Sequence, residues 1–435
     1  IIPPHDAGIA RCINENLAPW QSPYRTNMAD FMPNKQFHLL TEELAAHYYS
    51  SMEAVSLSAS PLPSPLKIAY TAMHGVGSQW IERAFKHVQA SNNLDPVLHV
   101  PCQKNPDPSF PTVKFPNPEE KGALDEAMEY ASHHDCQLII ANDPDADRLA
   151  AAERVLSSSG EPSWRLFTGN EIGIILGHYQ IQNYLKARKD SSTVVKPAAV
   201  VTTVVSSKML KKIADAEGIT CSDTLTGFKW IGNESIRLQE NGYKVLFSYE
   251  EALGYCVGDA LTDKDGISAA IAFSELTSQL FAAGITLREH LHAIFMKYGL
   301  SVSYNTYVFS YDKSVTDEIF KRLRHGGQDG GYVTKVGSAV ATRIRDITKG
   351  YDSGMRDLKS TLPLTPDSHM IMYEFDNNCS IILRTSGTEP KIKCYSEMAG
   401  GTQQVESELQ SILVGFVNEC ISFLLKPEEN HLVLA

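Results

Sequence analysis

The sequence predicts an α/β protein made of consecutive similar α/β domains with mixed or parallel sheets, followed by a smaller carboxyl-terminal α+β domain. Between residues 66 and 300, short aliphatic runs alternate with amphipathic segments, as is typical of sheets whose strands are connected by helices. From about residue 301, glycine-punctuated β-type runs replace that alternation, and an amphipathic helix follows them. A chain of 435 residues is also too long for one hydrophobic core, so several domains are expected.

The chain divides into four predicted segments. Residues 1–60 contain helical patterns without strands, and we interpret them as the helical tail of a truncated first α/β domain. Residues 61–190 and 191–300 are two repeats of the alternating pattern, and residues 301–435 form the α+β domain. Helix ends inside these segments are marked by two capping boxes and a glycine C-cap: Thr168 with Glu171, Thr286 with Glu289, and Gly218.

Composition bounds the partners and the compartment. The net charge of −12 disfavours a nucleic acid or an anionic membrane as a partner. No apolar stretch approaches the length of a membrane span, and the eight cysteines include no C-x-x-C pair, so we expect a cytoplasmic protein with reduced thiols. The first residue is Ile1 and no leader follows it, so we expect a fragment of a longer protein. We expect a monomer or a weak homo-oligomer.

Three aspartates occupy alternate positions directly after the aliphatic run at residues 137–141. The run reads as a buried strand, and Pro144 ends it because proline cannot donate a hydrogen bond to a neighbouring strand. If the stretch is extended, the carboxylates of Asp143, Asp145 and Asp147 project to one side and repel one another. A divalent cation that prefers oxygen ligands would offset that repulsion. The carboxyl end of a strand is also where ligands bind in open α/β sheets.

Two alternatives compete with a metal site in this stretch. An EF-hand loop counted from Asp143 would need glycine and glutamate where the sequence has Arg148 and Arg154, which excludes that type of calcium site. A solvated acidic turn remains open, because charged side chains are mostly exposed on protein surfaces.

A cationic stretch follows the predicted strand at residues 380–383. Arg384 can hold a phosphate through two parallel hydrogen bonds. Further donors follow at Ser386, Gly387 and Thr388, and then at Lys391 and Lys393. A polar surface turn is the alternative, because turns favour serine, threonine and glycine. The stretch is not a P-loop, since the chain contains no G-x-x-x-x-G-K-[ST].

Other stretches carry weaker signals. Thr226, Gly227 and Lys229 lie at a predicted strand-to-helix turn, where an anion site competes with a plain threonine N-cap. Glu250 is paired with Glu251 at the end of a strand, and it either accepts hydrogen bonds from sugar hydroxyls or is simply solvated. Lys264 lies between two acids that would keep it charged, which weakens it as a base. Gly75 and Gly77 lack the third glycine of a dinucleotide fingerprint.

Taken together and in this order, several stretches resemble those of the α-D-phosphohexomutases, most closely the phosphoglucomutase/phosphopentomutase branch. The resemblance covers nearly the whole chain and rests on residues 71–77, 110–112, 116–119, 142–148, 224–229, 250–255 and 384–390. It implies four domains around a central cleft. The segment 61–190 would then be the metal-binding domain, 191–300 the sugar-binding domain and 301–435 the phosphate-binding domain.

The resemblance also implies roles for individual residues. Asp143, Asp145 and Asp147 would hold Mg²⁺, Arg148 would lie beside a phosphoserine, and Lys264 is similar to a proposed general acid/base. Contacts to the sugar would come from Thr226, Gly227, Lys229 and Glu250. The phosphate that is not transferred would be held by Arg384, Ser386, Gly387, Thr388 and Lys393.

By the same resemblance, a phosphoserine donates its phosphoryl group to a sugar monophosphate, and the bisphosphate reorients before the serine is rephosphorylated. We therefore expect a phosphosugar mutase that interconverts glucose 1-phosphate and glucose 6-phosphate, or the 1- and 5-phosphates of ribose or deoxyribose. Glucose 1,6-bisphosphate would be the intermediate and activator. Two alternatives stay open: a glucose 1,6-bisphosphate synthase, which is a phosphotransferase, and a non-catalytic sugar-phosphate-binding remnant.

Two departures from the family pattern matter. The family's serine loop lies upstream of a Pro-His-Asp stretch, and Pro4-His5-Asp6 opens this sequence, so we expect the nucleophilic serine to be absent and the chain to be inactive. Ala252 stands where many relatives have a serine that touches the sugar, which leaves the preference for hexose or pentose open.

Overall fold

The computed structural model describes residues 1–18, 40–52, 66–92, 96–156, 160–190, 196–366, 368–387, 389–401 and 403–434. The chain forms two compact units: unit 1 comprises residues 1–167, 227–248 and 254–284, and unit 2 comprises residues 168–226, 249–253 and 285–435. The described residues form three β-sheets, whose strands pair in parallel or antiparallel, together with many helices. This confirms the α/β class. The division into four sequential domains stays a prediction.

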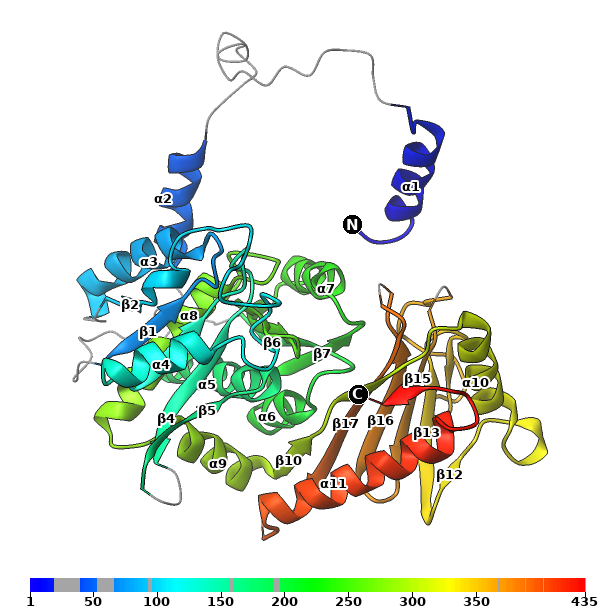
Figure 1. Cartoon of the computed structure of the whole chain (residues 1–435). Helices are drawn as coiled ribbons and strands as arrows, with labels where there is room; N and C mark the ends of the chain where they lie inside the picture. The colour runs from blue at the N-terminus through cyan, green and yellow to red at the C-terminus, as the bar shows by residue number, and fades with distance from the viewer. Residues whose placement is uncertain are drawn as a thin grey trace. The chain divides into compact units, whose positions relative to one another are not determined.

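Unit 1 is built on a five-stranded sheet in the order β2-β1-β3-β4-β5 (Figure 1). The first three of these strands are parallel, and β4 and β5 continue the sheet in antiparallel pairing. The strands are β1 (Ile68–Thr71), β2 (Leu98–His99), β3 (Leu138–Ala141), β4 (Ala150–Leu156) and β5 (Pro162–Leu166). The helices of the unit are α1 (His5–Glu15), α2 (Thr41–Met52), α3 (Gly77–Asn92), η2 (Pro101–Gln103), α4 (Asp125–His133), α7 (Phe228–Glu240) and α8 (Gly266–Ala282).

Small side chains let α4 approach one face of this sheet closely. Ala127 and Ala131 of α4 and Ala69, Ile139 and Ala152 of the strands are fully buried in one cluster. The parallel pairing of β1 with β3 places the carboxyl ends of both strands at the same edge. The loops that leave this edge carry the candidate site.

Unit 2 contains a nine-stranded sheet. Its main order is β12-β13-β15-β16-β17-β11-β18, with β10 paired to β17 and β14 to β13. The strands are β10 (Leu300–Ser303), β11 (Thr306–Phe309), β12 (Lys335–Val336), β13 (Ala339–Asp346), β14 (Tyr351–Asp352), β15 (Met370–Phe375), β16 (Cys379–Thr385), β17 (Lys391–Gly400) and β18 (Val433–Leu434). Asn378 at φ +61° lies in the tight turn of the hairpin between β15 and β16.

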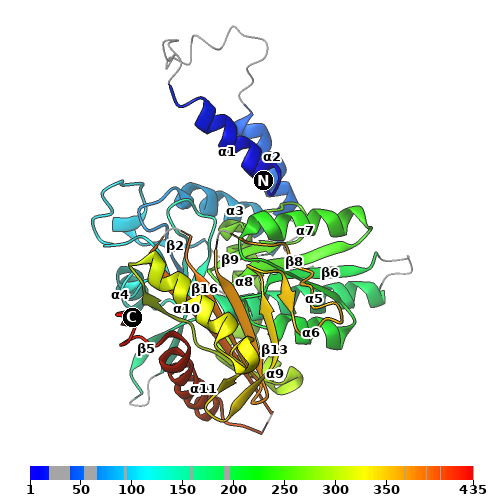
Figure 2. The ribbon, with the colours of Figure 1, turned by 90° about the vertical axis from the view of Figure 1, so that its right-hand side faces the viewer.

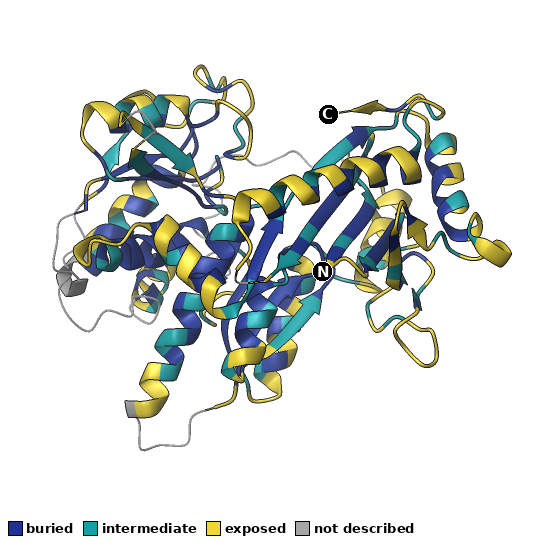
Figure 3. Cartoon of the chain, turned by 90° about the horizontal axis from the view of Figure 1, so that it is seen from below, coloured by how far each residue is buried: buried dark blue, intermediate teal, exposed yellow. Residues whose placement is uncertain are grey.

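Two helices cover one face of the nine-stranded sheet, α10 (Lys313–His325) and α11 (Glu406–Cys420) (Figure 2). Phe320 of α10 stacks on His369 at 4.5 Å between ring centroids, and Phe416 of α11 meets Phe375 at 5.2 Å. His369 and Phe375 lie an even number of residues apart along β15 and its approach, so both point to this helix-covered face. Figure 3 shows the strands largely buried while the helices expose their outer sides. Short helical segments follow α10 and α11 at η3 (Gln328–Gly330) and η4 (Ile421–Leu425).

The remaining elements form the third sheet and its helices. This four-stranded sheet contains β6 (Ala198–Thr203), β7 (Thr220–Thr224), β8 (Lys244–Glu250) and β9 (Gly254–Val257), and β6 and β7 pair in parallel. Unit 2 also holds α5 (Gly169–Asp190), α6 (Met209–Glu217) and α9 (Leu287–Tyr298). Both capping boxes and the left-handed C-cap at Gly218 are present as predicted.

One helix of the described residues is long and apolar enough to cross a membrane, Glu406–Leu425. The expectation that no stretch approaches that length was therefore wrong. In the structure this helix packs on β10 and β17 through Leu409, Leu413 and Val417, as the core helix of an α+β domain does.

Two histidines meet where α5 packs on α9. The rings of His178 and His290 lie 5.7 Å apart between centroids. Burial, and then the neighbouring charges of His290 and Lys297, lower the pKa of His178 from 6.5 to about 4. In the unfolded chain this histidine takes up a proton near pH 6.5, whereas in the folded protein it does so only near pH 4. The stability that depends on the neutral ring is therefore lost as the pH falls from about 6.5 to 4.

We predict that His178→Gln reduces the loss of stability on acidification. Urea denaturation at pH 7 and at pH 4.5 should show a pH-dependent loss that is smaller than in the parent protein by up to about 2 kcal/mol, because each unit of pKa shift corresponds to about 1.4 kcal/mol. His133→Gln, at an exposed position on α4, is the control. An unchanged loss in His178→Gln would show that this histidine does not titrate as described.

Candidate active site

The aspartate stretch leaves the carboxyl end of β3 beside the end of β1. Asn142 anchors its base: the Tyr70 hydroxyl donates to Asn142 Oδ1 at 2.7 Å, and Asn142 Nδ2 donates to the carbonyl of Arg148 at 2.5 Å. Asn142 is fully buried, so both hydrogen bonds are made away from solvent. One side chain therefore ties the two ends of the stretch together.

The stretch is a turn, so the assumption of an extended chain was wrong. The amide of Ala146 donates to the carbonyl of Asp143 at 2.9 Å, and Ala146 adopts φ +63°. This turn still brings the three carboxylates together, because one oxygen from each of Asp143, Asp145 and Asp147 lies within 4.8 Å of the others. The convergence of the side chains is confirmed, and a tight turn produces it.

Two glycines from other parts of unit 1 hold this turn at backbone contact. A Cβ on Gly75 would lie 2.2 Å from Pro144 Cα, and a Cβ on Gly266 would lie 2.2 Å from the carbonyl oxygen of Arg148. The amide of Val76 donates a hydrogen bond to the carbonyl of Pro144 at 2.8 Å. The amide of Gly266 donates one to the carbonyl of Ala146 at 3.2 Å. Gly75 and Gly266 therefore have a packing role, because only glycine permits such an approach.

Two cations offset part of the negative charge of the turn. Arg148 Nε lies 3.3 Å from Asp143 Oδ2, and Lys264 Nζ lies 2.8 Å from Asp147 Oδ2. Three carboxylates therefore face two cations. Burial, aided by the charges of Asp147 and Asp145, raises the pKa of Asp143 to about 6, against a hydrogen bond from the Arg148 amide that lowers it. The turn retains an excess of negative charge.

The donor set fits a hard divalent cation such as Mg²⁺. Magnesium binds oxygens at about 2.0–2.1 Å, so any two of its ligands lie at most about 4.2 Å apart, and three carboxylate oxygens within 4.8 Å of one another need only small movements to share one ion. Asp147 Oδ1 is buried and accepts no hydrogen bond from any described residue, as a carboxylate oxygen available to a metal would be. Lys264 holds the other oxygen of Asp147, and a bound cation would compete with it.

Gly227 and Lys229, from the predicted turn before α7, belong to unit 1 together with the aspartate turn. Thr226 belongs to unit 2. Gly227 is the N-cap of α7 at φ +104° and no side chain caps it, so the threonine-cap explanation of Thr226 fails. Phe228 brings the start of α7 beside the aspartate turn, because Lys264 Nζ lies 5.6 Å from the centre of its ring. Lys229 is exposed and lies 5.4 Å from the Trp230 ring.

Glu250 ends β8 in unit 2, where a tight turn follows it. A Cβ on Gly169 would lie 1.8 Å from the carbonyl oxygen of Glu251, and Leu253 adopts φ +62°. Glu251 also accepts hydrogen bonds from the hydroxyls of Thr203 at 3.4 Å and Ser206 at 3.3 Å. The carboxylate of Glu251 therefore supports the turn that presents the half-buried Glu250.

The cationic stretch forms the hairpin between β16 and β17 in unit 2. Arg384 and Lys393 are directly opposite each other in the antiparallel register, so their side chains lie on one face of the sheet. Arg384 also pairs with Met370, the neighbour of His369, so this face is the one that α10 and α11 leave uncovered. Like charges placed opposite each other are destabilising. Neither side chain forms an ion pair or a hydrogen bond with any described residue, which is the arrangement expected of an anion site.

The loop between these strands carries the hydroxyl donor Ser386 and the exposed Gly387. The amide of Ser386 donates to the carbonyl of Lys391 at 2.9 Å, which closes the hairpin. Lys391 itself is paired with Glu389 at 2.6 Å and lies 4.3 Å from the centre of the Tyr307 ring. Thr388 lies outside the described residues.

The chain is similar to known protein families and to known proteins. Residues 46–156 match "Phosphoglucomutase/phosphomannomutase, alpha/beta/alpha domain II", and residues 168–298 match domain III of the same family. The chain is 38% identical over 436 residues to "Glucose 1,6-bisphosphate synthase" of Pongo abelii, with 100% of this chain and 68% of that protein covered. The chain belongs to the phosphoglucomutase/phosphomannomutase family. The resemblance stated from the sequence is confirmed.

A second protein similar to this chain is "Phosphopentomutase" of Mus musculus. The two are 38% identical over 426 residues, covering 96% of this chain and 67% of that protein. The crystal structure of the phosphoglucomutase pp63/parafusin from Paramecium has the same fold, with a TM-score of 0.59 and 17% identity over 88% of this chain and 62% of that one. The chain therefore spans about two thirds of the length of these relatives.

Three residues of the site escaped the sequence analysis. Tyr70, the side chain of Asn142 and Gly266 shape the aspartate turn without contributing a carboxylate. Gly266 follows the Asp263–Lys264–Asp265 run, and its position at the start of a helix was visible in the sequence. Its contact with Arg148 depends on how α8 packs, which no local pattern reports.

We predict that Gly266→Ala weakens Mg²⁺ binding by roughly 10- to 100-fold, the usual cost of disturbing groups that orient metal ligands. The added methyl would displace the Arg148 carbonyl and with it the turn. Isothermal titration calorimetry with MgCl₂ measures the change. Gly415→Ala, on α11 with open space around its Cβ, is the control and should bind like the parent protein. Equal affinities of both variants would refute the packing role of Gly266.

Proposed function

We propose that the protein is a phosphosugar mutase that interconverts a sugar 1-phosphate with the 6-phosphate of glucose, or with the 5-phosphate of ribose or deoxyribose. The observation that carries this proposal is the pairing of Arg384 with Lys393 across β16 and β17, with neither side chain in an ion pair with a described residue. Two such cations on one sheet face match the charge of a phosphate group. The relatives named as a phosphopentomutase and a bisphosphate synthase support the same class of substrate.

The two groups of residues divide the work in this proposal. Arg384, Lys393, Ser386 and Gly387, with Thr388, hold the phosphate that stays on the sugar. Asp143, Asp145 and Asp147 hold Mg²⁺, which when bound would neutralise charge on the phosphoryl group that is transferred. Arg148 adds a guanidinium beside Asp143 that can stabilise the same developing charge. Thr226, Gly227, Lys229 and Glu250 are proposed to contact the sugar.

Lys264 is proposed as the general acid/base for the sugar hydroxyl. Its ammonium group is held by Asp147 at 2.8 Å and lies 3.6 Å from Asp263, so it is positioned as a proton donor. To act as a base it must lose a proton, which both carboxylates oppose. Occupation of Asp147 by a cation would weaken that restraint.

A phosphorylated serine would carry the phosphoryl group, with glucose 1,6-bisphosphate as intermediate and activator. No stretch of residues 1–435 resembles the family's serine loop. We therefore expect a polypeptide of this sequence to bind sugar phosphates without turning them over. Other proposed properties are a cytoplasmic location, a monomer or weak homo-oligomer, and the absence of nucleic-acid and membrane partners.

Synthesis of glucose 1,6-bisphosphate from an acyl phosphate donor is the second candidate function. The relative of that name, which is 38% identical over the whole chain, favours it. Adding the serine loop of a relative and comparing 1,3-bisphosphoglycerate with glucose 1,6-bisphosphate as donors separates a synthase from a mutase. Binding without turnover under both conditions would favour a non-catalytic remnant.

We predict that Arg384→Ala weakens binding of glucose 1,6-bisphosphate in the presence of Mg²⁺ by about 10- to 100-fold. Hydrogen bonds to charged groups contribute about 1.5–3 kcal/mol, and 1.4 kcal/mol is a factor of ten. Isothermal titration calorimetry measures the affinity, and Arg356→Ala, at an exposed position of the same unit, is the control. The proposal fails if the parent protein does not bind the bisphosphate, or if both variants bind it equally.

A further inference from the structure

The nine-stranded sheet carries a recess at the end where α10 begins, beside the hairpin that bears Arg384 and Lys393. Thr385 follows Arg384 on β16 and therefore points to the helix-covered face. The amide of His369 donates to Thr385 Oγ1 at 3.0 Å, and the amide of Thr385 donates to the carbonyl of His369 at 3.0 Å. A pocket of about 640 Å³ opens beside this pair, between the start of α10 and the β16–β17 hairpin. This volume is within the range of about 300–1,000 Å³ that is usual for small-molecule sites.

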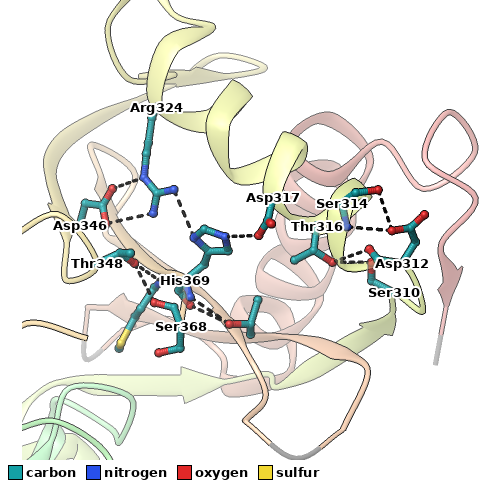
Figure 4. Close-up of polar contacts among 12 residues, drawn as sticks. Ser310, Asp312, Ser314, Thr316, Asp317, Arg324, Asp346, Thr348, Ser368 and His369 are labelled. Carbon is teal, nitrogen blue, oxygen red and sulfur yellow. Dashed lines mark hydrogen bonds and ion pairs between the residues drawn. The ribbon is translucent and has the colours of Figure 1, made fainter. Parts of the chain in front are cut away.

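One wall of the pocket is a chain of charged groups that ends on an accessible carboxylate (Figure 4). Arg324 is buried and forms two hydrogen bonds with the fully buried Asp346, at 2.5 and 3.2 Å. Its third contact is to His369 Nδ1 at 3.2 Å, and His369 Nε2 lies 2.9 Å from Asp317 Oδ1. The buried pair thus holds the imidazole ring, and the ring holds Asp317.

The hydrogen-bond pattern assigns the tautomer of His369. A guanidinium group can only donate, so Nδ1 must accept from Arg324 and the proton must lie on Nε2, where it is donated to Asp317. Both ring nitrogens are therefore occupied, and His369 has no nitrogen left to act as a base. The pocket is consequently suited to binding and not to proton transfer. Asp317, with half of its side chain exposed, keeps a second oxygen that can accept from a ligand.

The opposite side of the pocket supplies donors and an aromatic surface. Lys313, at the first turn of α10, forms no ion pair or hydrogen bond with its side chain in the described part of the chain. Tyr311 is 72% exposed and stacks on Phe309 with 5.8 Å between ring centroids and 2° between the ring planes. Ser310 Oγ lies 2.7 Å from Thr316 Oγ1, which itself donates to the backbone of Asp312, so Ser310 retains acceptor capacity toward the pocket.

We propose that this pocket binds a small polyol, a monosaccharide or its phosphate. Hydroxyl groups both donate and accept, so they can use the carboxylate of Asp317, the ammonium of Lys313 and the hydroxyl of Ser310 together. A simple anion would meet the carboxylates of Asp317 and Glu389, and a simple cation would meet Lys313 and Lys391. An apolar ligand would leave these polar groups unsatisfied. The stacked Tyr311 offers a flat face for the C–H side of a sugar ring.

This pocket adjoins the site under the proposed function. His369 and Thr385 line it from the helix-covered face, whereas Ser386 and Lys391 line it from the hairpin that also carries the proposed phosphate site. Neither Tyr311 nor Lys313 belongs to the proposed catalytic or phosphate-binding residues. The two sites can therefore be removed one at a time.

Saturation-transfer NMR with glucose and with glucose 6-phosphate tests the proposal on the full chain. Arg384→Ala weakens the proposed phosphate site by about 10- to 100-fold, as predicted above, and in this background the second site should still bind a probe. Adding Tyr311→Ala and Lys313→Ala should weaken that binding by about tenfold or more, which corresponds to at least 1.4 kcal/mol. Both positions lie at the surface, so these changes spare the core. Lys335→Ala in the same unit is the control and should leave binding unchanged.

The outcomes separate the two proposals. Tighter binding of glucose 6-phosphate than of glucose in Arg384→Ala identifies the ligand as a sugar phosphate, and equal binding identifies a neutral sugar. Loss of all binding in Arg384→Ala would overturn the second site and leave the proposed function intact. Binding that persists in Arg384→Ala but ignores the changes at Tyr311 and Lys313 would also overturn it.

Discussion

The enforced closeness of three carboxylates is the constraint on which the candidate site of unit 1 depends. Their oxygens lie within 4.8 Å of one another because Asn142 ties the ends of the turn and two glycines fix its backbone at contact distance. Arg148 and Lys264 compensate two of the three charges. The closeness of these like charges is imposed by packing, and a divalent cation is the partner that would stabilise it.

Unit 2 contains a cluster of like charges of the opposite sign, the cations Arg384 and Lys393. Arg384 and Lys393 are forced together by strand register, and neither forms an ion pair with a described residue. An unbalanced cluster of anions in one unit and an unbalanced cluster of cations in the other are complementary to a metal ion and to a phosphate. Under the proposed function, a phosphorylated sugar and Mg²⁺ would supply these two partners.

Local patterns in the sequence predicted what depends on neighbouring residues. The capping boxes at Thr168 and Thr286 and the strand before Asp143 are all present. Features that depend on distant contacts were missed or misjudged. The positive φ of Ala146 arises because the turn is clamped between Gly75 and Gly266, and the pairing of Lys264 with Asp147 requires α8 to be docked. Register, and not composition, placed Arg384 opposite Lys393.

Anomalous diffraction from crystals soaked in MnCl₂ measures the central claim most directly, because Mn²⁺ takes the same oxygen ligands as Mg²⁺. The account predicts one strong manganese peak bound by carboxylate oxygens of Asp143, Asp145 and Asp147, with Lys264 displaced from Asp147. A structure in which manganese binds elsewhere, or in which the three aspartates remain paired only with Arg148 and Lys264 at saturating metal, would contradict it.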